Sequence, residues 1–62
     1  MAAEREVIFE FIQIGAAVKV TAVDTESGIE VSIVGDPKVG ETALKKLVRQ
    51  KLDYVLAKRR GA

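Results

Sequence analysis

The sequence predicts an α+β fold: a three-stranded antiparallel β-meander in the order 1-2-3, with one C-terminal α-helix packed on one face. Two observations give this prediction. Apolar and polar residues alternate with period two in three short segments of residues 7–34, which is typical of half-buried strands. Residues 41–59 then place apolar residues three and four positions apart, as an amphipathic helix does. A chain of 62 residues is long enough for one small domain, residues 1–62.

The first strand is predicted at residues 7–14, where successive side chains fall on opposite faces. Gly15-Ala16 follows as a two-residue turn, because glycine at the first turn position suits a type II′ hairpin. The second strand is expected at residues 17–24 and the third at residues 29–34. A four-residue loop that ends in Gly28 joins them.

These turns predict a register. If Ile14 faces Ala17, two apolar rows cross one face of the sheet, and that face becomes the core. The rows are Phe9–Ala22–Val31 and Phe11–Val20–Ile33. The complete predicted core is Val7, Phe9, Phe11, Val18, Val20, Ala22, Ile29, Val31, Ile33, Leu44, Leu47, Val48, Leu52, Val55 and Leu56.

The helix is predicted at residues 41–59, after Gly35-Asp36-Pro37 ends the strand pattern. Glu41 favours the helix N-terminus because its negative charge complements the helix dipole, and the basic residues near the end favour the C-terminus. Lys51 projects close to the apolar stripe, so we expect its aliphatic stem to lie along the stripe.

Composition excludes several kinds of site. The chain contains no cysteine and no histidine, so it can form neither a disulfide nor a thiolate or imidazole metal site. We therefore expect no metal and no cofactor. A domain of this length buries only about 60% of the surface that its unfolded chain exposes, so many such domains need additional stabilisation. Self-association is the stabilising device left to consider.

The sequence favours a cytoplasmic protein without a membrane span. The longest uncharged run, residues 11–18, is far too short to cross a bilayer. The first six residues carry charges where a signal peptide would be apolar. The apolar face of the helix is needed for the core, so we expect no binding to a membrane surface either.

One helix can cover only one face of the predicted sheet, and the other face carries several aliphatic side chains. Both outer strands also present unpaired backbone groups. We interpret these surfaces as an interface, either for a homodimer formed through the first strand or this face of the sheet, or for an unknown protein partner. The competing interpretation is that isolated surface aliphatic residues are normal in soluble proteins. The candidate interface residues are Ile8, Ile12, Ile14, Val23 and Val34.

The net charge of +1 is unevenly distributed. Residues 41–60 hold seven basic and two acidic residues, a balance of +5, and the rest of the chain has a balance of −4. A basic helix face could neutralise phosphates, which makes nucleic-acid binding the alternative function. No exposed aromatic residues interleave with these charges, and basic residues in a last turn are also ordinary helix chemistry. The candidate nucleic-acid contacts are Lys45, Lys46, Arg49, Lys58, Arg59 and Arg60.

Motifs for catalysis or ion binding are incomplete. Residues 35–42 resemble a phosphate-binding loop, but Glu41 stands where that loop needs lysine. Residues 24–30 are too short for an EF-hand and favour a hairpin turn. Glu10 and Glu30 are expected on one face with Lys19, as a solvated charge cluster rather than a catalytic carboxylate pair. The serines have no neighbouring base, so we do not expect an enzyme.

Four segments, residues 9–12, 17–24, 27–35 and 51–56, carry a resemblance to a known family. The chain resembles a set of short uncharacterised alphaproteobacterial proteins that are grouped as a domain of unknown function. This resemblance covers most of the chain and implies no activity and no site residues. The function expected from the residues is therefore a non-enzymatic interaction module that self-associates, with weak nucleic-acid binding as the alternative.

Overall fold

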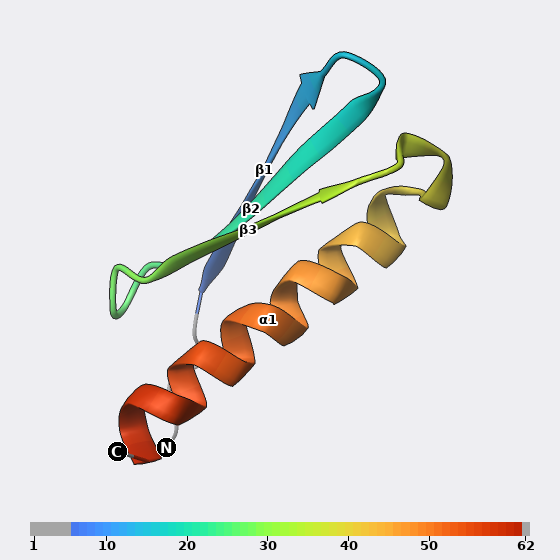
Figure 1. Cartoon of the computed structure of the whole chain (residues 1–62). Helices are drawn as coiled ribbons and strands as arrows, with labels where there is room; N and C mark the ends of the chain where they lie inside the picture. Colours follow the sequence, from blue (N-terminus) through green and yellow to red (C-terminus); the bar gives the residue numbers. More distant parts are fainter. Residues whose placement is uncertain (1–5, 62) are drawn as a thin grey trace.

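The computed structural model describes residues 6–61, and for residues 60 and 61 only the backbone. Strands β1 (Val7–Ile14), β2 (Ala17–Asp24) and β3 (Glu30–Gly35) form one antiparallel sheet in the order β1-β2-β3. A short 3-10 helix, η1 (Pro37–Val39), leads into the long helix α1 (Glu41–Gly61), which lies along one face of the sheet (Figure 1). The predicted fold class is confirmed. The sequence did not predict η1, β3 begins and ends one residue later than expected, and α1 ends two residues later than expected.

The register of the sheet follows the predicted pairing. Phe9 pairs with Ala22, and Phe11 pairs with Val20, which in turn pairs with Ile33. Gly15 has a φ of +58°, and no described non-glycine residue has a positive φ. A positive φ at the first turn position alone is the type II′ pattern, so the glycine places the turn and the turn sets the register.

The loop between β2 and β3 is built around one buried carboxylate. The Asp24 side chain is fully buried, and its Oδ2 accepts hydrogen bonds from the Ser27 amide at 3.0 Å and the Ser27 hydroxyl at 2.6 Å. The Gly28 amide donates to the Asp24 carbonyl at 2.8 Å while Gly28 adopts a φ of +79°. Aspartate, serine and glycine are therefore turn-forming residues here, as the hairpin interpretation predicted.

The segment that resembled a phosphate-binding loop is a compact turn into the helix. The Asp36 Oδ1 accepts a hydrogen bond from the Lys38 amide at 2.9 Å, and Pro37 occupies the first position of η1. Gly40 then adopts a φ of +97° and a ψ of +150°, a conformation that is essentially restricted to glycine. Its carbonyl accepts from the Leu44 amide at 3.1 Å, which is a bond of the first helical turn.

The core lies between α1 and the central and third strands, because α1 packs mainly on β2 and β3. Half-buried residues on the sheet, including Phe9 and Phe11, pack against the rim of this core. Val55, also predicted in the core, is half-buried. The buried apolar residues are Val18, Val20, Ala22, Leu44, Val48, Leu52 and Leu56.

One predicted core residue is wrong. Leu47 is 50% exposed. The i+4 neighbour of Leu47 on the helix is Lys51, whose ammonium reaches the Ser32 carbonyl of β3. Leu47 therefore lies on the flank of α1 that faces the outer side of β3. The sheet ends at β3, so no strand is available to cover Leu47.

Gly35 allows the end of β3 to approach α1 closely. A Cβ atom at this position would lie 2.6 Å from the Leu44 Cδ2 atom, well inside a normal contact. Any side chain at position 35 would therefore require the Leu44 side chain to move.

Candidate interaction surface

The face of the sheet turned away from α1, which we call the open face, carries the predicted interface residues. Ile8, Ile12, Ile14 and Val34 are exposed by 51%, 44%, 52% and 67%, whereas Val23 is half-buried by its neighbours. The alternation of β1, β2 and β3 gives this face its full set of side chains: Ile8, Glu10, Ile12, Ile14, Ala17, Lys19, Thr21, Val23, Glu30, Ser32 and Val34.

A polar row divides the open face. Glu10 pairs with Thr21, which pairs with Ser32, and the two hydroxyl oxygens of Thr21 and Ser32 lie 2.9 Å apart in a hydrogen bond. Ile8 and Val23 are direct partners on one side of this row. The other side has Ile12 and Val34 flanking Lys19. The structure therefore places the predicted interface residues on one face, but in two clusters.

The two edges of the sheet differ in a way that the sequence did not indicate. At the β1 edge, the Glu6 carbonyl accepts from the Thr25 amide at 3.1 Å, which fixes the even-numbered residues of β1 as those bonded to β2. The backbone groups of the odd-numbered residues therefore point away from the sheet. These residues are Val7, Phe9, Phe11 and Gln13.

At the β3 edge, the Asp24 amide donates to the Ile29 carbonyl at 2.9 Å, so the odd-numbered residues of this segment bond to β2. The Ser32 backbone then points outward, and its carbonyl accepts a hydrogen bond from the Lys51 ammonium at 2.9 Å. Sequence reasoning placed the Lys51 stem along the helix stripe but missed this partner. A lysine beside the apolar stripe and facing an edge strand is the signal that could have found it.

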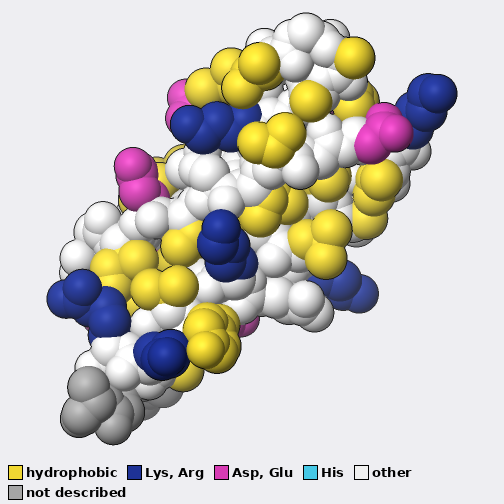
Figure 2. Space-filling model, viewed as in Figure 1, with side chains coloured by type: hydrophobic (Ala, Val, Ile, Leu, Met, Phe, Trp, Pro, Cys, Tyr) yellow, Lys and Arg dark blue, Asp and Glu magenta, His cyan; other side chains and the backbone are white. Residues whose placement is uncertain are grey.

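The basic residues of α1 do not all lie on one side of the helix. The Lys45 ammonium lies 5.5 Å from the centroid of the Phe9 ring, and the Lys58 ammonium lies 5.5 Å from the centroid of the Tyr54 ring. Lys45 and Lys58 are about 140° apart around the helix axis at about 100° per residue. Arg49 Nε donates to the Asp53 carboxylate at 3.1 Å. Figure 2 shows Lys and Arg side chains dispersed between apolar and uncharged surface.

Lys46 and Arg59, also predicted as nucleic-acid contacts, are exposed, whereas the Arg60 side chain lies outside the described residues. The predicted basic set therefore separates into at least two directions around α1. Lys45 and Lys46 are i,i+4 and i,i+3 neighbours of Arg49 and share one side of α1, whereas Lys58 lies on another side.

Residues 4–59 match a family described as a domain of unknown function, DUF6898. The chain belongs to this family. The match agrees with the resemblance to an uncharacterised family, and the alphaproteobacterial origin stays a prediction. Comparison with curated proteins and with solved structures gives no match.

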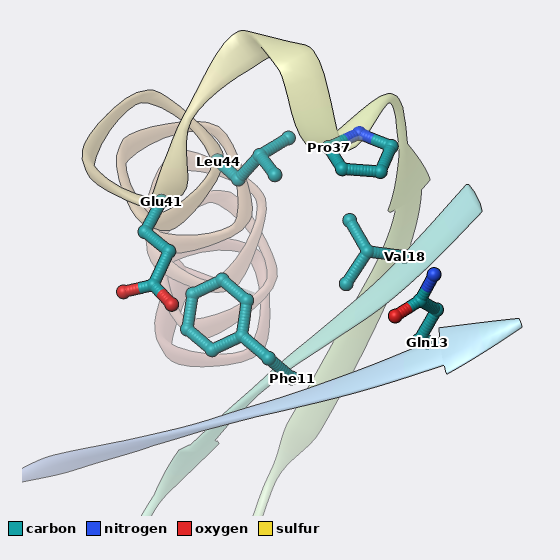
Figure 3. A pocket seen from close by; sticks show the side chains of 6 residues that line it. All are labelled: Phe11, Gln13, Val18, Pro37, Glu41 and Leu44. Carbon is teal, nitrogen blue, oxygen red and sulfur yellow. The ribbon is translucent and has the colours of Figure 1, made fainter. Parts of the chain in front are cut away.

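One hollow of this DUF6898 chain lies where the end of β1 meets the start of α1 (Figure 3). It encloses about 350 Å³ and is lined by Phe11, Gln13, Val18, Pro37, Glu41 and Leu44. The Glu41 carboxylate lies close to the Phe11 ring, and the Gln13 amide stands on the opposite side (Figure 3). The lining offers one carboxylate and one amide on an apolar floor, without a nucleophile and base side by side.

Two further site types are not found in the described part of this DUF6898 chain. Among residues 6–61, no group of three His, Cys, Asp or Glu side chains could hold a metal ion. No helix in the same range is both long enough and apolar enough to cross a membrane.

Proposed function

We propose that this DUF6898 chain is a small non-enzymatic interaction module that self-associates through β1 and the open face. One observation carries the proposal. Four large aliphatic side chains, each 44–67% exposed, lie on a sheet face that α1 leaves uncovered. A cytoplasmic location is a further part of this proposal and stays a prediction.

The exposed apolar surface supplies part of the expected affinity. Complete burial of a large aliphatic side chain contributes about 1.5–3 kcal/mol, so covering the exposed half of four of them on two copies contributes roughly 8 kcal/mol. Association itself costs about 4–15 kcal/mol in lost freedom. The two terms are of similar size, so apolar burial alone falls short of the roughly −8 kcal/mol that a micromolar dimer requires. A dimer in that range therefore needs a further contribution, which backbone hydrogen bonds along β1 can supply.

Sedimentation velocity across a micromolar concentration series tests the proposal. We expect the mass to rise from one chain of 6.7 kDa towards two as the concentration increases. Replacing Ile12 with Thr should weaken this association, because the substitution removes apolar surface from the open face. The matched control is Val39→Thr, since Val39 is 52% exposed in η1, away from the sheet faces. A strict monomer at every concentration would contradict the proposal.

Nucleic-acid binding through α1 stays the alternative prediction. Three of its proposed contacts, Lys45, Arg49 and Lys58, have partners within the chain. Titration of generic RNA and DNA at low and then increasing salt measures this function, because phosphate binding weakens steeply with salt. Absence of binding at low salt would exclude it.

A further inference from the structure

We propose that two copies of the chain pair through β1 in antiparallel fashion, with Glu10 at the two-fold axis, to form one continuous six-stranded sheet. This inference rests on the proposed function, self-association, and names the surface and register that perform it. A two-fold interface uses the same patch on both copies, so β1 must be complementary to itself.

The β1 edge is the unused hydrogen-bonding edge of the sheet. The backbone groups of Val7, Phe9, Phe11 and Gln13 point outward, and among residues 6–61 no other segment hydrogen-bonds to them. An exposed edge of eight residues is a template for strand addition. At the opposite edge the Lys51 ammonium donates a hydrogen bond to the Ser32 carbonyl. This contact blocks strand addition at the middle of β3.

The outward-facing residues restrict the register. Residues that hydrogen-bond between the two copies must be odd-numbered on both strands. Three residues can lie on the two-fold axis and keep most of β1 paired under this condition. Phe9 on the axis pairs with Phe9 of the second copy, and Phe11 on the axis pairs with Phe11. With Glu10 on the axis, Phe9 pairs with Phe11 of the second copy. The last arrangement pairs residues 7–13 along their whole length and forms about eight backbone hydrogen bonds.

The charged side chains beside the two phenylalanines favour the register with Glu10 on the axis. The Lys45 ammonium lies over the Phe9 ring, and the Glu41 carboxylate lies beside Phe11 in the same pocket lining (Figure 3). With Glu10 on the axis, Lys45 of each copy faces Glu41 of the other, so two opposite-charge pairs form. A centre at Phe9 would instead bring two Lys45 side chains together. A centre at Phe11 would bring two Glu41 side chains together.

On the open face, this register forms favourable aliphatic contacts and one unfavourable like-charge contact. Ile8 of each copy lies opposite Ile12 of the other, so these exposed apolar side chains become direct cross-strand neighbours. Val34 lies on β3, away from the paired edge, and gains no such partner, so this register uses only part of the apolar surface of the open face. Glu10 lies beside Glu10 of the second copy, which is one like-charge pair on an exposed row. Two opposite-charge pairs and two aliphatic pairs outweigh this single repulsion.

A backbone variant tests the use of the β1 edge. Gln13 is exposed, and its backbone amide points away from β2, so Gln13→Pro removes a backbone donor that has no backbone partner among residues 6–61. The matched control Gln13→Ala removes the side chain and keeps the backbone amide. We expect Gln13→Pro to raise the dimer dissociation constant about tenfold or more, because two hydrogen bonds per dimer are lost, and Gln13→Ala to leave it nearly unchanged. Circular dichroism checks that both variants keep the wild-type fold.

A charge exchange tests the register independently. Lys45→Glu and Glu41→Lys should each weaken the homodimer severalfold, because each creates two like-charge pairs. An equimolar mixture of the two variants should associate with wild-type affinity, since both opposite-charge pairs are restored in the mixed dimer. Tagging one variant allows the mixed dimer to be counted by mass spectrometry.

The outcomes separate the two proposals. A wild-type chain that remains monomeric at all concentrations overturns self-association. A wild-type dimer whose affinity is unchanged in Gln13→Pro and in both charge variants, but reduced in Ile12→Thr, keeps self-association and overturns pairing through β1. Weakening by Gln13→Pro without recovery in the mixed charge variants overturns the register with Glu10 on the axis.

Discussion

Strands β1 and β3 are both edges of the same small sheet, yet the chain treats them differently. α1 covers β3, the Lys51 ammonium binds the outward Ser32 carbonyl, and Gly35 lets the end of β3 pack closely on Leu44. Within residues 6–61 no segment covers the outer edge of β1, and its two phenylalanines remain half-buried. One helix is too narrow to close both edges, so its sideways position decides which edge is available to a partner.

The largest expected effect tests where α1 contacts the sheet. Leu52 is fully buried over the sheet, whereas Leu47 is 50% exposed on the flank beyond β3. We expect Leu52→Ala to reduce the free energy of unfolding by about 2–5 kcal/mol, because it leaves a cavity in the core. The same substitution at Leu47 should change it by about 0.5 kcal/mol or less. Urea unfolding of both variants provides the measurement. Equal losses in the free energy of unfolding would contradict the described position of α1 on the sheet.

The next effect concerns the end of β3 at Gly35, which packs closely on Leu44. Gly35→Ala would set a Cβ atom 2.6 Å from Leu44 Cδ2, so Leu44 must move. We expect a loss of about 1–3 kcal/mol in the free energy of unfolding, which is typical of overpacking. The φ of Gly35 is not positive, so the contact alone causes this loss. An unchanged thermal unfolding midpoint would show that the Leu44 side chain moves aside without a cost in stability.

A smaller effect measures the protection of the β3 edge. Lys51→Met keeps an unbranched side chain but removes the donor to the Ser32 carbonyl. We expect a loss of about 0.5–1 kcal/mol in the free energy of unfolding, since the bond is solvent-exposed, together with a greater tendency to form oligomers larger than a dimer. Lys46→Met on the solvent-facing side of α1 is the control. Light scattering that rises equally for both variants would contradict a specific role for Lys51.

The smallest effect concerns the proposed axis on β1. Glu10→Gln removes the like-charge pair that the register creates between two copies. Cross-strand pairs of this kind contribute about 0.2–1 kcal/mol, so we expect the dimer dissociation constant to fall by up to about fivefold. Lys19→Gln, on the same face, is the control and should not tighten the dimer. A weaker dimer for Glu10→Gln would argue against Glu10 on the axis.

Local sequence rules were sufficient for the fold. Gly15 and Gly28 fix both turns, and once the turns are fixed the period-two pattern leaves one register for rows such as Phe11–Val20–Ile33. The helix stripe was also readable, apart from Leu47. The burial of Leu47 depends on how far α1 is displaced across the sheet. This displacement is a property of packing between elements and not of the helix alone.

The candidate surface was predictable by face but not by edge. Alternation placed Ile8, Ile12, Ile14 and Val34 on the open face, and all four are exposed there. The difference between the β1 and β3 edges depends on the hydrogen bond from Lys51 to Ser32, whose partners are 19 residues apart. Periodicity within a segment carries no information on such a long-range side-chain contact. The sequence therefore suggested the first strand as an interface but could not show that the β3 edge is protected.

The most direct test of the central claim is residue-resolved amide hydrogen exchange in β1 as a function of protein concentration. At low concentration the amides of Ile8, Glu10 and Ile12, which bond to β2, should be protected, and those of Phe9, Phe11 and Gln13 should exchange quickly. At concentrations where the mass corresponds to a dimer, we predict that Phe9, Phe11 and Gln13 also become protected. Fast exchange of these three amides in a demonstrated dimer would contradict pairing through β1.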